Sequence, residues 1–170
     1  GRFTRYRGDG WQALILDPSK SLEIATVIIA TLRAAGFATR IAIGIGEVES
    51  QGSVDLSDAR GAAFNSSGRA LDQMHKVQVL TVEGTPVRGE DKAIVLFLEE
   101  RTNRWSREQA EAVARAMDPL STTAKDIAKD LGITPQAMSE RLNNAGFVTI
   151  LYALTLWREA KINDGWATTK

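Results

Sequence analysis

The sequence contains no cysteine, and this absence removes two classes of site from consideration. Without thiols the chain forms neither a disulfide framework nor a thiolate metal centre. Its 170 residues are enough for one generous core or two small ones, and we expect two small domains that fold by packing alone.

Long apolar runs and an excess of charge are also missing. No run approaches the roughly 20 residues that a membrane-spanning helix needs, and no charged-then-apolar leader opens the chain. We therefore expect a cytoplasmic protein with no membrane partner. The formal net charge is zero, with 21 basic and 21 acidic side chains, so any contact with DNA must come from a local patch.

Familiar catalytic patterns are absent as well. His75 is the only histidine, has no partner at metal-ligand or catalytic-triad spacing, and is expected at the surface near a helix end. Gly44-Ile45-Gly46 lies inside a predicted strand, so it is no phosphate-binding loop. We expect no catalytic residues and no bound cofactor on this evidence.

The first half alternates between strand and helix patterns. Residues 3–6 and 11–16 read as strands, and Gly8-Asp9-Gly10 between them predicts a tight hairpin. A helix follows, capped by Ser19 or Ser21 and ended by Gly36.

The next segments are a strand over 39–48, a helix from 57 or 58 to 76, and a strand over 77–82. In the 39–48 strand, isoleucines alternate with alanine or glycine, so we expect another element to pack closely on the small-residue face. This order of elements predicts a single sheet with helices across it.

Residues 84–91 contain Pro86 and Gly89 and form the best domain boundary. Beyond it we expect helices over 92–102, 107–117 and 149–161, with Trp105 and Trp157 used for packing. The predicted division is an α/β module over 1–84 and a helical domain over 91–162.

A helix-turn-helix is predicted at 123–145. Apolar Ile127, small Ala128 and Gly132 suit a first helix and its turn, and Thr134 followed by Pro135 opens a second helix. The pattern resembles the helix-turn-helix of phage repressors, bacterial activators and sigma-type domains. The alternative is a compact tri-helical packing unit that does not bind DNA.

If the motif binds double-stranded DNA, the outward residues of its second helix should reach base edges and its basic residues should hold phosphates. One helix reads few base pairs, so we also expect a homodimer. The predicted base contacts are Gln136, Ser139, Glu140 and Asn143, and the predicted phosphate contacts are Lys125, Lys129, Thr134 and Arg141.

Residues 3–76 resemble part of the ferredoxin-like core of class III nucleotide cyclases and diguanylate cyclases. The matching pieces are the Gly8-Asp9 hairpin, the strand over 40–48 and the helix that carries Asn65 and Arg69. Their order, followed by a helix-turn-helix, resembles the SatD family. The resemblance implies an α+β fold: a partial cyclase-type sheet whose first strand would precede residue 1, followed by an all-α helix-turn-helix domain.

The same resemblance implies a nucleotide site. Asp9 would hold Mg²⁺ or Mn²⁺, while Asn65 and Arg69 would contact a nucleotide. The other metal-binding aspartate would lie before residue 1, and Arg5 replaces the base-reading lysine. We therefore expect a DNA-binding transcriptional regulator whose degenerate cyclase-like module senses a nucleotide. One alternative is a metal-dependent nucleotidyl cyclase-type enzyme whose other metal-binding aspartate lies before residue 1. The other alternative is a scaffold in which both halves only mediate assembly.

Overall fold

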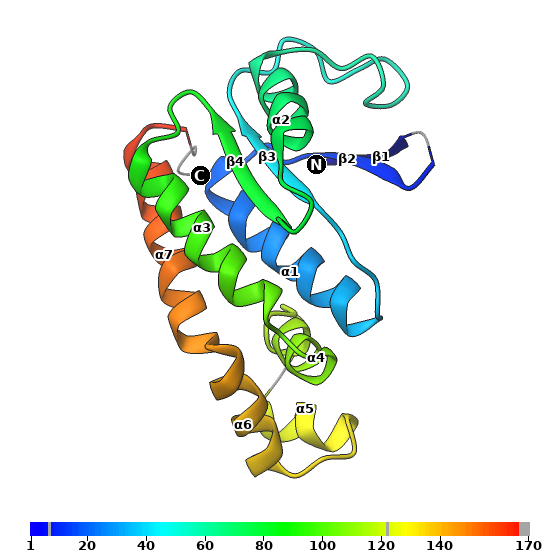
Figure 1. Cartoon of the computed structure of the whole chain (residues 1–170), viewed down its shortest axis with the longest axis vertical. Coiled ribbons are helices and arrows are strands. Elements are labelled where there is room, and N and C mark those ends of the chain that lie inside the picture. The colour runs from blue at the N-terminus through cyan, green and yellow to red at the C-terminus, as the bar shows by residue number, and fades with distance from the viewer. Residues whose placement is uncertain (7, 122, 167–170) are drawn as a thin grey trace.

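The computed structural model describes residues 1–6, 8–121 and 123–166. In that part of the chain, strands and helices alternate up to β4, and everything after β4 is helical (Figure 1). In chain order the elements are β1 Arg2–Tyr6, β2 Gly10–Leu14, the short 3-10 helix η1 Pro18–Lys20, α1 Ser21–Ala34, β3 Ile41–Ile45, α2 Ala62–Gln73, β4 Leu80–Gly84, α3 Gly89–Asn103, α4 Arg107–Ala116, α5 Ala124–Asp130, α6 Pro135–Ala145 and α7 Phe147–Asn163.

Strands β3 and β4 form a parallel pair that lies between helices on both faces (Figure 1). Ile41, Ile43 and Ile45 are buried in the core with α1 and α3. The opposite face of β3 is covered by α2, which connects the two strands. The expected alternation along β3 is therefore confirmed, because each of its faces meets a different layer.

The small-residue face of β3 allows α2 to approach the strand closely. A Cβ atom added to Gly44 would lie 2.0 Å from the Ala63 carbonyl oxygen, well inside contact distance. Gly46 approaches the first turn of the same helix in a similar way, with Ala63 N at 3.0 Å from an added Cβ. Glycine is needed here for close approach of backbone to backbone.

The hairpin formed by β1 and β2 is antiparallel, as predicted, but it does not join β3 and β4. The expectation of a single sheet is therefore wrong for the described residues, which contain two separate two-stranded sheets. The hairpin contacts the loop after β3 instead, where Leu56 N donates to Thr4 Oγ1 at 2.9 Å and Arg2 donates to the carbonyl of Gly52 at 3.0 Å. The mixed α/β composition agrees with the expected α+β class, at this coarser level.

Several element boundaries differ from those predicted, among them the starts of α2 and β4. Helix α2 begins at Ala62 because Gly61, with φ 136°, has a non-helical backbone. In the loop before it, Asp55 and Asp58 accept hydrogen bonds from the backbone N–H groups of Ser57 and Ser53, respectively, which stabilise a non-helical conformation. Hydrogen bonds from Ser57 and Ser53 lower the pKa of Asp55 and Asp58, respectively. Strand β4 starts three residues later than predicted, where its pairing with β3 begins.

The hydrophobic core continues across the predicted boundary at 84–91. Ile29 of α1 and Val82 of β4 belong to the same buried cluster as Val113 of α4 and Leu154 of α7. Helix α1 packs directly against α4. The two predicted modules thus share one core.

None of the described helices combines the length and apolarity needed to span a membrane.

A buried ion pair joins the start of α3 to the end of α7. Lys161 Nζ donates to Asp91 Oδ2 at 2.8 Å and to Asp164 Oδ2 at 3.3 Å, and it lies 4.9 Å from the centre of the Trp157 ring. Both Lys161 and Asp91 are almost completely buried. Asp91 also accepts from the backbone N–H of Arg88, so the same carboxylate caps α3.

Replacing Lys161 with methionine should destabilise the protein by about 3–5 kcal/mol, because Asp91 would be left buried without its cationic partner. The matched control is Arg158→Met, which removes the exposed pair between Arg158 and Glu23 and should cost under about 1 kcal/mol. Urea denaturation of the two variants measures the difference. Equal losses would show that the buried pair has no special role.

Candidate nucleic-acid interface

Helices α4, α5 and α6 pack into a tri-helical unit around a small core of their own. Met138 of α6 and Ala128 of α5 are fully buried against Ala112 of α4, with Ile127 beside them. The interpretation of 123–145 as two helices joined by a tight turn is confirmed at the level of backbone structure.

The turn has the predicted local chemistry. Gly132 has φ 66°, a left-handed conformation that glycine adopts at no steric cost, and Ile133 N donates to the Ala128 carbonyl at 2.9 Å. Thr134 Oγ1 accepts from Ala137 N at 3.1 Å, which makes Thr134 the N-cap of α6, with Pro135 at the first helical position. The angle between the two helices is thus set by residues local to the motif.

Helix α6 ends at Gly146, whose φ of 74° marks a left-handed cap. The last carbonyl of α6, that of Ala145, accepts a hydrogen bond from Trp105 Nε1 at 3.0 Å. Trp105 lies between α3 and α4 and is buried in the main core, as expected for a packing residue, but its role in holding the end of α6 was not predicted. The sequence gives no signal for a bond across 40 positions.

The outward flank of α6 is open to solvent. Gln136, Ser139, Glu140 and Asn143 are all exposed, and no other part of the described chain covers them. Asn144 is exposed on the same helix, one turn after Glu140, and the sequence-based prediction omitted it. These polar side chains form a continuous surface on which a base-reading contact could be made.

The predicted phosphate contacts fall into two groups. Lys125 and Lys129 are exposed and lie one turn apart on α5, so they share a face. Arg141 is turned toward α4, where its guanidinium lies 3.4 Å from Glu111 Oε2, and only a quarter of its side chain is exposed. Thr134 Oγ1 is engaged in capping α6, although the residue itself is exposed. Of the four predicted phosphate contacts, the two lysines are therefore the ones whose side chains are exposed and have no structural role described above.

Acidic side chains on α4 surround Arg141. Besides Glu111, Glu108 lies near it, and the hydroxyl of Ser106 donates to the Glu108 carboxylate at 2.7 Å. This hydrogen bond lowers the pKa of Glu108, with a smaller contribution from the positive charge of Arg141. Arg141 therefore serves first to hold α6 against α4.

The residues that the cyclase resemblance selects lie on exposed surfaces. Asp9 is exposed in the hairpin turn, and Asn65 and Arg69 are exposed on the side of α2 that faces away from β3. None of the three lines the hollow between β4 and α3 or the hollow between the β1–β2 hairpin and α1. Among the described residues no group of three or more histidine, aspartate or glutamate side chains is placed to hold a metal ion. Their metal and nucleotide roles stay predictions.

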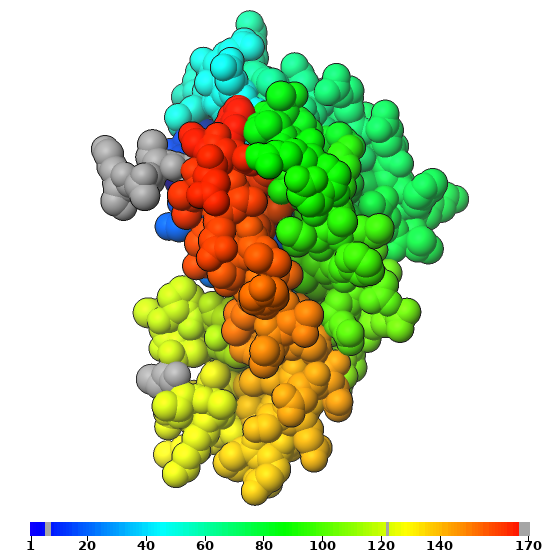
Figure 2. Space-filling view, turned by 90° about the vertical axis from the view of Figure 1, so that its left-hand side faces the viewer, coloured from blue at the N-terminus to red at the C-terminus, as the bar shows by residue number. Residues whose placement is uncertain are grey.

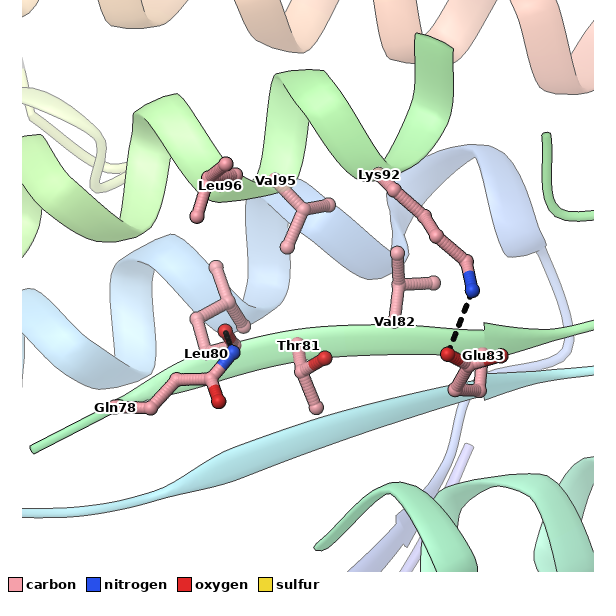
Figure 3. A pocket seen from close by; sticks show the side chains of 8 residues that line it. All are labelled: Gln78, Leu80, Thr81, Val82, Glu83, Lys92, Val95 and Leu96. Carbon is pink, nitrogen blue, oxygen red and sulfur yellow. Dashed lines mark hydrogen bonds and ion pairs between the residues drawn. The ribbon is translucent and has the colours of Figure 1, made fainter. Parts of the chain in front are cut away.

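Two hollows lie elsewhere on the surface. One, of about 190 Å³, runs between β4 and α3, and the ion pair between Lys92 and Glu83 at 2.7 Å closes one end of it (Figure 3). The other, of about 350 Å³, is almost wholly apolar and lies between the stacked rings of Phe3 and Trp11 and helix α1. His75 is exposed, as expected, and lies in neither hollow.

In comparisons with known proteins, no family model, no curated protein and no solved structure matches this chain. The site therefore has to be interpreted from its own geometry.

Enlarging Ala128 should disrupt this unit. Ala128→Leu places extra atoms where α5 meets α4 and α6 with no free volume, and should cost about 1–3 kcal/mol. Ala124→Leu makes the same change at an exposed position of the same helix and should stay within about 0.5 kcal/mol. Urea denaturation compares them. A neutral effect at Ala128 would contradict the close packing of α5.

Proposed function

We propose that this protein binds double-stranded DNA through its helix-turn-helix and acts as a transcriptional regulator. The observation that carries the proposal is the solvent-exposed polar flank of α6, at the end of the molecule farthest from the β3–β4 sheet (Figure 1). Because the described chain leaves this flank uncovered, α6 is free to approach a DNA groove.

The dimensions of α6 suit the major groove. Its 11 residues span about 16 Å, and the major groove of B-form DNA is wide enough to admit an α-helix. Gln136 lies in the first turn, the part of a recognition helix that meets base edges, and glutamine can pair with adenine through two hydrogen bonds. Asn143 offers the same chemistry two turns later.

Electrostatics limit how tightly one copy can bind. Residues 123–145 contain three basic and three acidic side chains, and one of the basic residues, Arg141, is paired with Glu111. Phosphate contacts therefore come mainly from Lys125 and Lys129. With few phosphates neutralised, base contacts must supply a large share of the specific affinity.

Replacing Gln136 with alanine should relax specificity at one base position. We expect a loss of about 1–3 kcal/mol on a duplex enriched from a random pool by the wild-type protein, and little loss on duplexes altered at that position. Fluorescence anisotropy measures both. Gln73→Ala, an exposed glutamine at the end of α2, is the control and should bind like the wild type.

Replacing Lys129 with alanine should weaken binding to all duplexes alike. It should also reduce the slope of log K against log salt concentration by about 1 per copy of the chain bound. The control is Lys76→Ala, since Lys76 is exposed and remote from the helix-turn-helix in sequence. If selection yields no enriched duplex, or if wild-type binding does not respond to salt, the proposed function is wrong.

A further inference from the structure

The outer face of α7 lies on the surface of the molecule, is largely apolar and is not covered by any other part of the described chain. From Phe147 to Trp157 the helix contains no charged residue. Its inner side is buried in the core, while in the space-filling view its outer side is open along its length (Figure 2, orange to red). A solvated helix ordinarily carries charges on such a face. Between Phe147 and Trp157, the exposed large apolar residues are Val148, Leu151, Tyr152 and Leu156.

Helix α3 adds an aromatic ring to this face. Asp91 contacts Lys161, and the Arg101 side chain passes beside Gly146, so α3 and α7 run antiparallel. Phe97 lies one turn before Arg101 on the α7 side of α3, which places it beside the central turns of α7, and 73% of it is exposed. We call Phe97, Val148, Leu151, Tyr152 and Leu156 the α7 face.

We propose that the α7 face binds the same face of a second copy of this chain, with the two α7 helices antiparallel about a twofold axis near Tyr152. This proposal rests on the proposed function, because it names the partner that the helix-turn-helix needs. A twofold axis brings each residue near it against the same residue of the other copy, so a charged residue there would face an identical charge. The uncharged centre of α7 meets that requirement.

The charges at the rim are complementary in this arrangement. An axis at Tyr152 brings Glu159 of one copy opposite position 145 of the other, next to Gly146 and the Arg101 side chain that passes it. Glu159 and Arg101 are both exposed, and neither forms an ion pair with another residue in the described part of the chain. Within one copy they lie too far apart to pair, since Glu159 lies 13 positions after Gly146 along α7.

Area and spacing support the same pairing. The five exposed side chains offer on the order of 500 Å² of apolar surface per copy, or about 1,000 Å² for the pair before the rim is counted. Tyr152 lies six positions after Gly146, and α6 continues outward from Gly146 (Figure 1). The centres of the two α6 helices would then be roughly 30 Å apart, close to the spacing of successive major grooves on one side of DNA.

The first test is the oligomeric state without DNA, measured by sedimentation velocity. The wild type should be a dimer, and Tyr152→Glu should weaken the dimer by on the order of tenfold or more. Phe37→Glu is the matched control, because Phe37 is exposed to 66% and Tyr152 to 65%. Circular dichroism confirms that each variant is folded. A wild type that stays monomeric at its highest soluble concentration overturns the proposal.

Charge exchange tests the orientation. Arg101→Glu and Glu159→Arg should each weaken the dimer several-fold, and the double variant should restore it. Failure of the double variant to restore a dimer that both single variants weaken overturns the antiparallel arrangement. A dimer that passes these tests but binds no DNA overturns the proposed function alone, whereas a monomer that binds DNA overturns only the pairing.

Discussion

Helix α4 is buried on two sides, and the position of the helix-turn-helix depends on this constraint. Ala110 and Val113 lie in the core shared with α1 and the β3–β4 sheet, while Ala112 lies in the small core with α5 and α6. All three are inaccessible to solvent. Small side chains on both sides of one helix leave it no freedom to rotate or tilt. The α/β part of the chain therefore sets the orientation of α6, with α4 as the shared element.

The helix-turn-helix could be predicted because its determinants are local. Gly132 sets the turn, Thr134 and Pro135 open α6, and Gly146 closes it, all within a few residues of the backbone that they control. The hairpin between β1 and β2 was predictable for the same reason, since its turn follows from Gly8 and Asp9. Patterns of this kind are retained in the folded protein because they do not depend on contacts with distant residues.

The errors arose where distant segments decide the structure. The hairpin contacts the loop after β3 through Thr4 and Leu56, which are 52 positions apart, and no local pattern reveals that this contact replaces a strand pairing. Similarly, Arg141 looked like a phosphate contact because its position on α6 is visible in the sequence. Its partner Glu111, on α4, is not. The solvent exposure of the outward residues of α6 could thus be predicted from the sequence, but the direction in which Arg141 points could not.

The neutral charge of the helix-turn-helix and the uncharged face of α7 fit one physical scheme. If the proposed function holds, a single copy with two exposed lysines on α5 would release few counterions, so its affinity for DNA would be weak and only moderately dependent on salt. Two copies held together would contact DNA as one molecule, and the second contact would be favoured by its high effective concentration without any added charge. Since Gly146 both ends α6 and caps the start of α7, the helix that would hold the copies together would also fix the end of each α6 helix. Specificity would then come from geometry, which suits a protein with no excess of positive charge.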